Sequence, residues 1–389
     1  MLFRSQANAA ETALATGVQQ VVGVLSLAAA VAWLRGEPAT ASTRAGAAGA
    51  VVGGTAAATD VAEAGWLHPA GRRAVEIAAA GGHHLRLTGP HESGTTMLAQ
   101  LLPGLLPPLT HSEAMQVTSI HCLAGEPPAQ TLIGRPPLRQ PHHTTSLPAL
   151  LGRGGINACP GEVSLAHHGV LLLQDAPQFP AAVLRALQQP LETGEIVIAR
   201  AGEPVRYPAQ FQLVLTATPC PCAAARNGQD CTCTSQALAR YAARLPAPLL
   251  DRIDLHVQPP PATPAGMAGP AEPSAALARR IAAARQAAAA RLHHTGCRLN
   301  ARVPAQEISG RWSPPPAARR AADQALDLGQ VSPRGHRQIL RVAWTIADLA
   351  GHPTPTATDI DEAVRMRIPT PAANMMDPGP EGEQDTDGR

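Results

Sequence analysis

Leu85-Arg-Leu-Thr-Gly-Pro-His-Glu-Ser-Gly-Thr-Thr-Met-Leu98 is the stretch that decides the fold. A short apolar strand leads into Gly89, Gly94 follows five residues later, and Thr96 opens a helical pattern. This spacing is typical of a phosphate-binding loop, in which backbone N–H groups and a helix N-terminus hold an anion. The sequence therefore predicts a first strand, an anion-binding loop and a helix that follows the loop directly.

The loop lacks the lysine that follows the second glycine in the pattern Gly-x-x-x-x-Gly-Lys-Ser/Thr. Thr95 occupies that position, and the sequence contains no lysine anywhere, so no shift of register supplies one. Glu92 adds a negative charge inside the loop, whereas Thr96 keeps the hydroxyl that binds magnesium. A strand–helix turn without a ligand is therefore an open alternative to nucleotide binding. The candidate nucleotide-binding residues are Gly89, Pro90, His91, Glu92, Ser93, Gly94, Thr95, Thr96 and Met97.

Two polar residues end the second apolar strand, which we expect at residues 169–173. A nucleotide hydrolase of this type carries two acids here, the first for the metal and the second to orient water. The first position is Gln174, which is neutral, and the second is Asp175. Because side chains along a strand alternate between faces, Asp175 does not simply replace its neighbour. Asp175 is the candidate catalytic acid and, with Thr96, the candidate magnesium ligand; the alternative is two solvated polar residues.

Four cysteines form two Cys-x-Cys pairs, Cys220 with Cys222 and Cys231 with Cys233. Four thiolates can surround one zinc ion tetrahedrally, although the spacing within each pair is tighter than usual. The alternative is four reduced thiols on a loop.

Arg252 lies between two acids, Asp251 and Asp254. It is a candidate for an arginine that reaches the nucleotide of a neighbouring subunit, and a local ion pair with one of the acids is the alternative. The histidine pairs at 83–84, 142–143 and 167–168 are interpreted as polar loop residues.

The order of elements predicts an α/β fold with a parallel sheet, followed by an all-α domain. Strands expected at 85–88, 169–173, 196–198 and 211–215 alternate with helices. After a proline-rich segment, helices are expected at 275–292, 316–326, 335–350 and 357–367.

Composition narrows the protein class. The formal net charge is +2, which does not itself indicate nucleic-acid binding. The apolar run from Val21 to Leu34 is shorter than the roughly 20 residues of a membrane span. Seven cysteines, four of them clustered, favour a reducing compartment and a cytoplasmic location.

Several stretches together resemble magnesium-chelatase-like AAA+ proteins of the ComM and YifB type. The resemblance covers about residues 60–368 in order, and residues 6–36 look like the end of the Lon-protease-like domain of that family. The stretches that carry it are Arg135-Pro-Pro-Leu-Arg-Gln-Pro-His-His-Thr144, Pro160-Gly-Glu-Val-Ser-Leu-Ala-His-His-Gly-Val-Leu171, Pro219-Cys-Pro-Cys222, Leu249-Leu-Asp-Arg-Ile-Asp-Leu-His-Val257 and the segment Ser332–Leu349.

The resemblance implies an AAA+ P-loop core with a helical lid, assembly into homo- or hetero-hexamers, and ATP-driven work on DNA such as branch migration. It implies that Arg252 is an arginine finger, that Arg334 is the lid arginine on the γ-phosphate, and that Thr218 is the polar sensor. The resemblance implies that residues 1–36 are a remnant of the Lon-protease-like domain, 60–258 the AAA+ core and 275–370 the helical lid. Composition predicts a flexible linker at 37–59, a proline-rich hinge at 259–274 and a disordered acidic tail at 371–389.

The departures from the family pattern cluster at the hydrolytic positions. The family loop reads Gly-Pro-Pro-Gly-Ser-Gly-Lys-Thr, an Asp-Glu pair stands where Gln174 and Asp175 are found, and the sensor is usually asparagine rather than Thr218. The sequence therefore predicts a degenerate, N-terminally truncated member with weak ATP binding and impaired hydrolysis, acting as a structural or regulatory subunit. An active branch-migration motor that uses Arg86 in place of the lysine, and a non-functional relic, are the alternatives.

Overall fold

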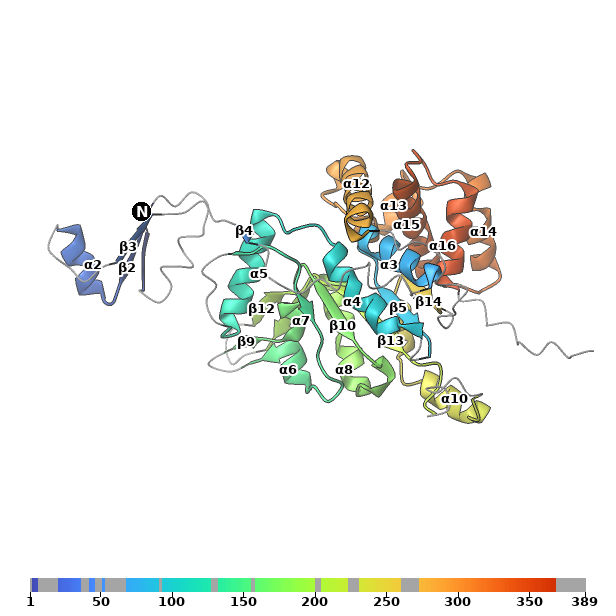
Figure 1. Ribbon diagram of the computed structural model, residues 1–389, viewed down its shortest axis with the longest axis horizontal. Helices are drawn as coiled ribbons and strands as arrows, with labels where there is room; N and C mark the ends of the chain where they lie inside the picture. The colour runs from blue at the N-terminus through green and yellow to red at the C-terminus, as the bar shows by residue number, and fades with distance from the viewer. Residues whose placement is uncertain are drawn as a thin grey trace, which may run out of the picture.

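A parallel five-stranded sheet forms the centre of the molecule, in the order β14-β5-β13-β10-β7 (Figure 1). The computed structural model describes residues 2–5, 20–35, 42–45, 51–52, 68–90, 93–126, 132–154, 158–199, 204–222, 231–259 and 273–368. The strands of the sheet are β5 (Leu85–Thr88), β7 (Leu138–Arg139), β10 (Val170–Leu173), β13 (Gln212–Ala217) and β14 (Leu255–Val257).

Helices cover both faces of this sheet, which explains why its central strands are almost continuously apolar. Leu85 and Leu87 belong to the core on one face, and Leu171 and Leu173 belong to the core on the other. The helices around the sheet are α3 (Pro69–Gly81), α4 (Thr95–Leu105), α5 (His111–Leu123), α6 (Leu147–Leu151), α7 (Glu162–Leu165), α8 (Ala181–Ala186), α9 (Gln188–Thr193), α10 (Ser235–Ala242) and α11 (Ala247–Leu250).

The C-terminal helices pack directly on α3. Ile339, Ala343 and Ile346 of α15 share one continuous hydrophobic core with the buried residues of α3 and β5. Figure 1 shows α12, α15 and α16 gathered around α3 on one side of the sheet. These helices are α12 (Ser274–Leu292), α13 (Ala305–Ser309), α14 (Pro316–Asp327), α15 (Pro333–Ala350) and α16 (Ala357–Arg367). The predicted α/β core and C-terminal all-α region are thus confirmed.

One predicted strand does not belong to the parallel sheet. Residues 196–198 lie in β11 (Glu195–Ile198), which forms an antiparallel hairpin with β12 (Val205–Pro208) outside the central sheet. The sequence reading also missed α5, which begins with a capping box between Thr110 and Glu113. An apolar run predicts a strand but does not specify its partner, and partner choice decides the sheet.

The N-terminal part contains a separate three-stranded sheet of β1 (Leu2–Ser5), β2 (Gln20–Val24) and β3 (Ser42–Ala45), with α2 (Leu27–Leu34). The range 37–59 is predicted to be a flexible linker. It holds β3 and also β4 (Val51–Val52), which pairs with β6 (Leu132–Ile133). The domain boundaries themselves stay predictions. Two further short strands, β8 (Gly152–Arg153) and β9 (Cys159–Pro160), pair with each other. No helix among the described residues is long and apolar enough to cross a membrane.

Candidate nucleotide site and cysteine cluster

The phosphate-loop geometry is retained at the carboxyl end of β5. Gly89 N–H donates to the Ala217 carbonyl, which ties the start of the loop to β13. Ser93 Oγ donates to the Pro90 carbonyl over 2.6 Å. A Cβ at Gly89 would lie only 2.3 Å from Ser93 Oγ. Gly94 has a φ of 66°, the left-handed conformation that glycine adopts without strain. His91 and Glu92 lie outside the described residues.

The helix α4 begins at Thr95 with no side-chain cap on its N-terminus. Its first N–H groups therefore stay available to an anion. Thr95 is only 7% exposed, and its Cγ2 would lie 3.3 Å from a Cβ at Gly89, so the side chain packs against the loop. Thr96 and Met97 are half-buried beside it, and Met97 packs on the core. The geometry suits an anion, but the charge that would neutralise it is missing.

Asp175 is held in an unusual backbone conformation after β10. Its φ of 47° and ψ of 50° are left-handed, which is rare for a residue with a side chain. Its N–H donates to Thr216 Oγ1 over 3.2 Å, so β13 fixes this turn. Gln174 and Asp175 are both half-buried at the same sheet edge as the loop. The sheet thus brings the predicted acid to the end at which the loop lies.

Thr218, the predicted sensor, has its hydroxyl engaged by two partners. The hydroxyl donates to the Cys220 carbonyl over 3.1 Å and lies 2.8 Å from the Tyr241 hydroxyl of α10. Because the Thr218 proton is used toward Cys220, Tyr241 is the donor in the second bond. Sequence reasoning missed Tyr241, since nothing local indicates that α10 returns to the end of β13.

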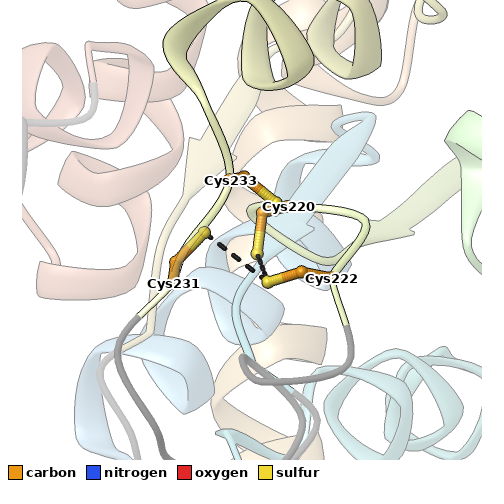
Figure 2. Close-up of side chains that lie close together, drawn as sticks. All are labelled: Cys220, Cys222, Cys231 and Cys233. Carbon is orange, nitrogen blue, oxygen red and sulfur yellow. Dashed lines mark hydrogen bonds between the residues drawn. The ribbon is translucent and has the colours of Figure 1, made fainter.

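The four clustered cysteines converge on one point (Figure 2). The Sγ atoms of Cys220, Cys222, Cys231 and Cys233 all lie within 4.8 Å of one another. Cys222 Sγ lies 3.2 Å from Cys220 Sγ and 3.6 Å from Cys231 Sγ. Sulfur atoms about 2.3 Å from a central zinc lie about 3.8 Å apart, so the four sulfur atoms are close enough together to bind one zinc ion. Burial, followed by the hydrogen bond with Cys222, raises the pKa of the Cys220 thiol to about 12.

Arg252 does not pair with the neighbouring acids. Its guanidinium binds Glu192, at the end of α9, and also donates to the Pro248 carbonyl. Arg334, at the start of α15, lies 3.6 Å from the same Glu192 carboxylate and 3.8 Å from Asp251. The local ion pair that was the alternative for Arg252 is therefore wrong. The two arginines that the family resemblance singles out share one acidic partner.

Arg252 and Arg334 lie near the amino-terminal ends of the strands, whereas the loop lies at the carboxyl-terminal ends. The loop follows β5, whereas Arg252 and Asp254 precede β14, and Asp254 accepts a hydrogen bond from His84 N–H just before β5. A strand of four residues separates these two edges by about 13 Å. Arg334 thus lies far from the loop of its own chain, because α15 packs on α3, and its predicted contact with a γ-phosphate stays a prediction.

Arg86 projects from the middle of β5 and is the candidate substitute for the missing lysine. Its Nε atom is buried with no hydrogen-bond partner among the described residues. Burial lowers the pKa of Arg86, and the nearby Tyr241 partly offsets this. Arg86 also contributes, after burial and Arg367, to lowering the pKa of His256 to about 3. Its charge therefore lies beside the residue that holds Thr218.

All three histidine pairs lie outside helices and strands, as predicted, but one member of each of two pairs is buried. His83 is completely buried, and its Nε2 lies 2.7 Å from Thr345 Oγ1 of α15. His167 is 2% exposed and accepts a hydrogen bond from Gln210 N–H at Nδ1. These side chains join loops to the core, which a sequence pattern does not reveal.

The sheet order, the loop after its second strand and the helices behind it define an AAA+ type of α/β protein. The family description "Magnesium chelatase, subunit ChlI" matches residues 66–266, and "Magnesium chelatase, subunit ChlI C-terminal" matches residues 271–367. The chain therefore belongs to the magnesium-chelatase-like family that includes ComM and YifB.

Relatives are found across bacteria. An uncharacterized protein of Mycobacterium tuberculosis is 44% identical over 92% of this chain and 71% of its own length. YifB of Salmonella typhimurium is 39% identical over 76% of this chain and 58% of its own length. The competence protein ComM of Haemophilus influenzae is 38% identical over 72% of this chain and 54% of its own length.

Proposed function

We propose that this chain is a ComM-like AAA+ protein that binds ATP weakly, hydrolyses it poorly, and serves as a structural or regulatory subunit of a ring that processes DNA. The observation that carries the proposal is the joint substitution of Thr95, Gln174 and Thr218 on one edge of an otherwise intact sheet. Framework motifs are kept, whereas the positions that handle phosphate and water are changed.

The residues at the loop fit a phosphate only in part. The uncapped N-terminus of α4 and the left-handed Gly94 suit an anion. Thr96 and Asp175 would be the ligands of a magnesium ion, which in this family neutralises the phosphates. A charge-assisted hydrogen bond contributes about 1.5–3 kcal/mol, so loss of the lysine and the first acid costs about 3–6 kcal/mol. ATP affinity is then weaker by about two to four decades.

Arg252 and Arg334 would act on a neighbouring subunit. Both lie near the amino-terminal ends of the strands, away from the loop of their own chain, and both contact Glu192. In a homo- or hetero-hexamer, an anion presented by the next subunit would compete with Glu192 for these guanidinium groups. A chain that hydrolyses little ATP can therefore still complete the site of an intact partner.

The cysteine cluster is proposed to hold structural zinc. Four sulfur ligands with tetrahedral separations and no open position are the arrangement of a structural rather than a catalytic site. Cys233 leads directly into α10 through Thr234, and Cys220 accepts from Thr218. The metal would therefore fix the end of β13 against α10. Persistent thiols suit a cytoplasmic location, where they stay reduced.

An active motor is the second candidate, and Arg86 is the observation that favours it. A buried guanidinium with an unpartnered Nε lies near Tyr241 and the sensor position. If this cation replaces the lysine, ATP turnover by the natural protein is measurable and is lost in Arg86→Gln.

The test is ATP binding and turnover by the purified full chain, beside a Thr95→Lys, Gln174→Asp double variant. We expect the natural protein to bind ATP at millimolar concentrations or weaker, and the double variant to bind at least tenfold more tightly. Clear turnover by the natural protein that is abolished in Asp175→Ala would sink the proposal. A regulatory subunit, unlike a relic, should associate with an active homologue. The ATP turnover of that homologue should then be lower with the Arg252→Ala variant of this chain than with the natural chain.

A further inference from the structure

A cleft of about 1230 Å³ runs along the amino-terminal ends of the strands, between β5, β10 and β13 on one side and the helices α12 and α15 on the other. Seven of its lining residues are arginine and three are acidic, which leaves an excess of four positive charges. The cleft lies opposite the phosphate loop of the same chain, and two of its arginines, Arg252 and Arg334, are those proposed to meet the nucleotide of a neighbouring subunit. An excess of this size inside a concave surface focuses a positive potential.

Neutral oxygen atoms hold three of these arginines in place. Arg285 Nε donates to the Ala79 carbonyl over 2.8 Å. Arg341 donates twice to the Val303 carbonyl, over 2.9 and 2.6 Å. Arg302 donates to Gln210 Oε1. The guanidinium groups are therefore positioned, but their charges are not neutralised by these contacts.

Other partly buried arginines in the same part of the chain are paired differently. Arg291 binds both oxygens of Asp348, and Arg73 binds Glu362 and Glu76. The fold thus supplies carboxylates where an arginine has only to be stabilised. At Arg285, Arg302 and Arg341, carbonyl and amide oxygens take the place of these carboxylates, so their hydrogen-bond partners do not neutralise the positive charge.

The three acids of the cleft are hydrogen-bonded or ion-paired to groups other than Arg285, Arg302 and Arg341, although Asp254 acts electrostatically on Arg341. Glu192 binds Arg252 and lies near Arg334. Asp254 accepts from His84 N–H, and Glu113 accepts from the backbone and side chain of Thr110 in the cap of α5. Glu113 is close enough to act electrostatically on Arg285 and Arg302, so it offsets part of their charge.

Burial makes these cations costly without an anion. It lowers the pKa of Arg285 to about 10, and it lowers the pKa of Arg302 and of Arg341 as well. Neighbouring arginines add to the effect at Arg285 and Arg341, which is the repulsion expected when like charges face one cavity. A bound anion would offset both the burial of these guanidinium groups and the repulsion between them.

We propose that this cleft binds the phosphodiester backbone of a nucleic-acid strand through Arg285, Arg302 and Arg341. A single phosphate would fill only a small part of the cavity, whereas successive phosphates along a strand can meet guanidinium groups spaced around it. The inference rests on the part of the proposed function that concerns DNA. It is separate from ATP binding by the loop of the same chain, which lies at the opposite ends of the strands, and it concerns the part of the cleft lined by Arg285, Arg302 and Arg341 rather than by Arg252 and Arg334.

The test is fluorescence anisotropy of a labelled 20-mer of thymidine with the full chain, without nucleotide, from 50 to 200 mM salt. We expect an Arg285→Gln, Arg302→Gln variant to bind at least tenfold more weakly. The slope of log affinity against log salt should also fall by about 1.4, at about 0.7 for each lost phosphate contact. The matched control removes two exposed arginines, Arg279 and Arg320, and should change both quantities much less.

Arg285→Lys keeps the positive charge and should retain most of the oligonucleotide binding. Thermal unfolding checks that each variant is folded, so that a loss of binding can be assigned to the lost charge. Equal losses in the cleft and control variants, or no binding by the natural chain, would overturn the proposal whatever the ATP measurements give. Binding of pyrophosphate alone would indicate a site for free phosphate instead. Loss of self-association in light scattering, with oligonucleotide binding intact, would indicate that the cleft receives an acidic protein surface.

Discussion

Arg252 binds the carboxylate of Glu192, sixty residues earlier in the chain, and Glu192 also lies 3.6 Å from Arg334. One exposed acid thus holds both arginines that the family resemblance assigns to the nucleotide of a ring. A competing anion from a neighbouring subunit would have to displace only partly solvated ion pairs with Glu192 and Asp251. The arrangement keeps both cations oriented while the chain is alone.

Replacement of Glu192 by glutamine should lower the free energy of unfolding by at most about 1 kcal/mol. The Arg252 side chain is 14% exposed but Glu192 is 48% exposed, so solvent screens much of the attraction. Urea unfolding of Glu192→Gln measures the effect. Glu195→Gln is the control, because its partner Arg206 is 62% exposed and its loss should cost less. A smaller effect for Glu192→Gln than for the control would contradict the assignment.

The contact between Thr218 and Tyr241 should contribute about 1 kcal/mol to stability, the usual net value of a hydrogen bond. Tyr241 is 8% exposed, so removal of its hydroxyl in Tyr241→Phe leaves little access for water to replace it. A double-mutant cycle with Thr218→Val, measured by urea unfolding, isolates the pair. Additive effects of the two changes would show that the hydroxyl groups do not interact.

Loss of a cysteine ligand should remove the proposed zinc and destabilise the contact of β13 with α10. We expect equimolar zinc by elemental analysis of the natural chain, and little zinc together with a lower melting temperature in Cys220→Ser. Cys159→Ser is the matched control, since Cys159 lies outside the cluster. Full zinc content in Cys220→Ser would exclude this cysteine as a ligand.

Local sequence patterns predicted much of the fold and part of the site. The loop from Gly89 to Gly94 and the apolar run ending at Leu173 are short-range signals, and the parallel sheet brings them to one edge. The cysteine pairs were also detectable, because their ligands are close in sequence. The side of the sheet on which α15 packs has no such signal, so local patterns do not predict where Arg334 lies relative to the loop. Glu192, Tyr241 and the buried His83 were missed for the same reason, since each acts through a partner that is distant in sequence.

Stability should fall as pH decreases from about 6.5, because His167 resists protonation. Burial, with smaller effects of His168 and Arg302, lowers the pKa of His167 from 6.5 to about 3. Between these values the unfolded chain binds a proton that the folded chain does not. The free energy of unfolding then falls by up to about 1.4 kcal/mol for each pH unit lost. Urea unfolding at pH 7.5 and 5 should show a shallower dependence in His167→Gln, and an unchanged one in a variant of the exposed His142.

Because Asp175 has a left-handed backbone conformation, the stability of variants at this position should depend on the shape of the new side chain. At a φ of 47°, a β-branched side chain meets its own backbone, whereas asparagine tolerates the left-handed region as aspartate does. Asp175→Asn should therefore leave the melting temperature nearly unchanged. Asp175→Val should cost about 1–2 kcal/mol from the backbone alone. Gln174→Val tests the neighbouring position, which does not share the positive φ, and should cost less. Comparable losses of stability in the two valine variants would show that the turn after β10 relaxes freely. The backbone conformation would then not fix the direction of the Asp175 side chain.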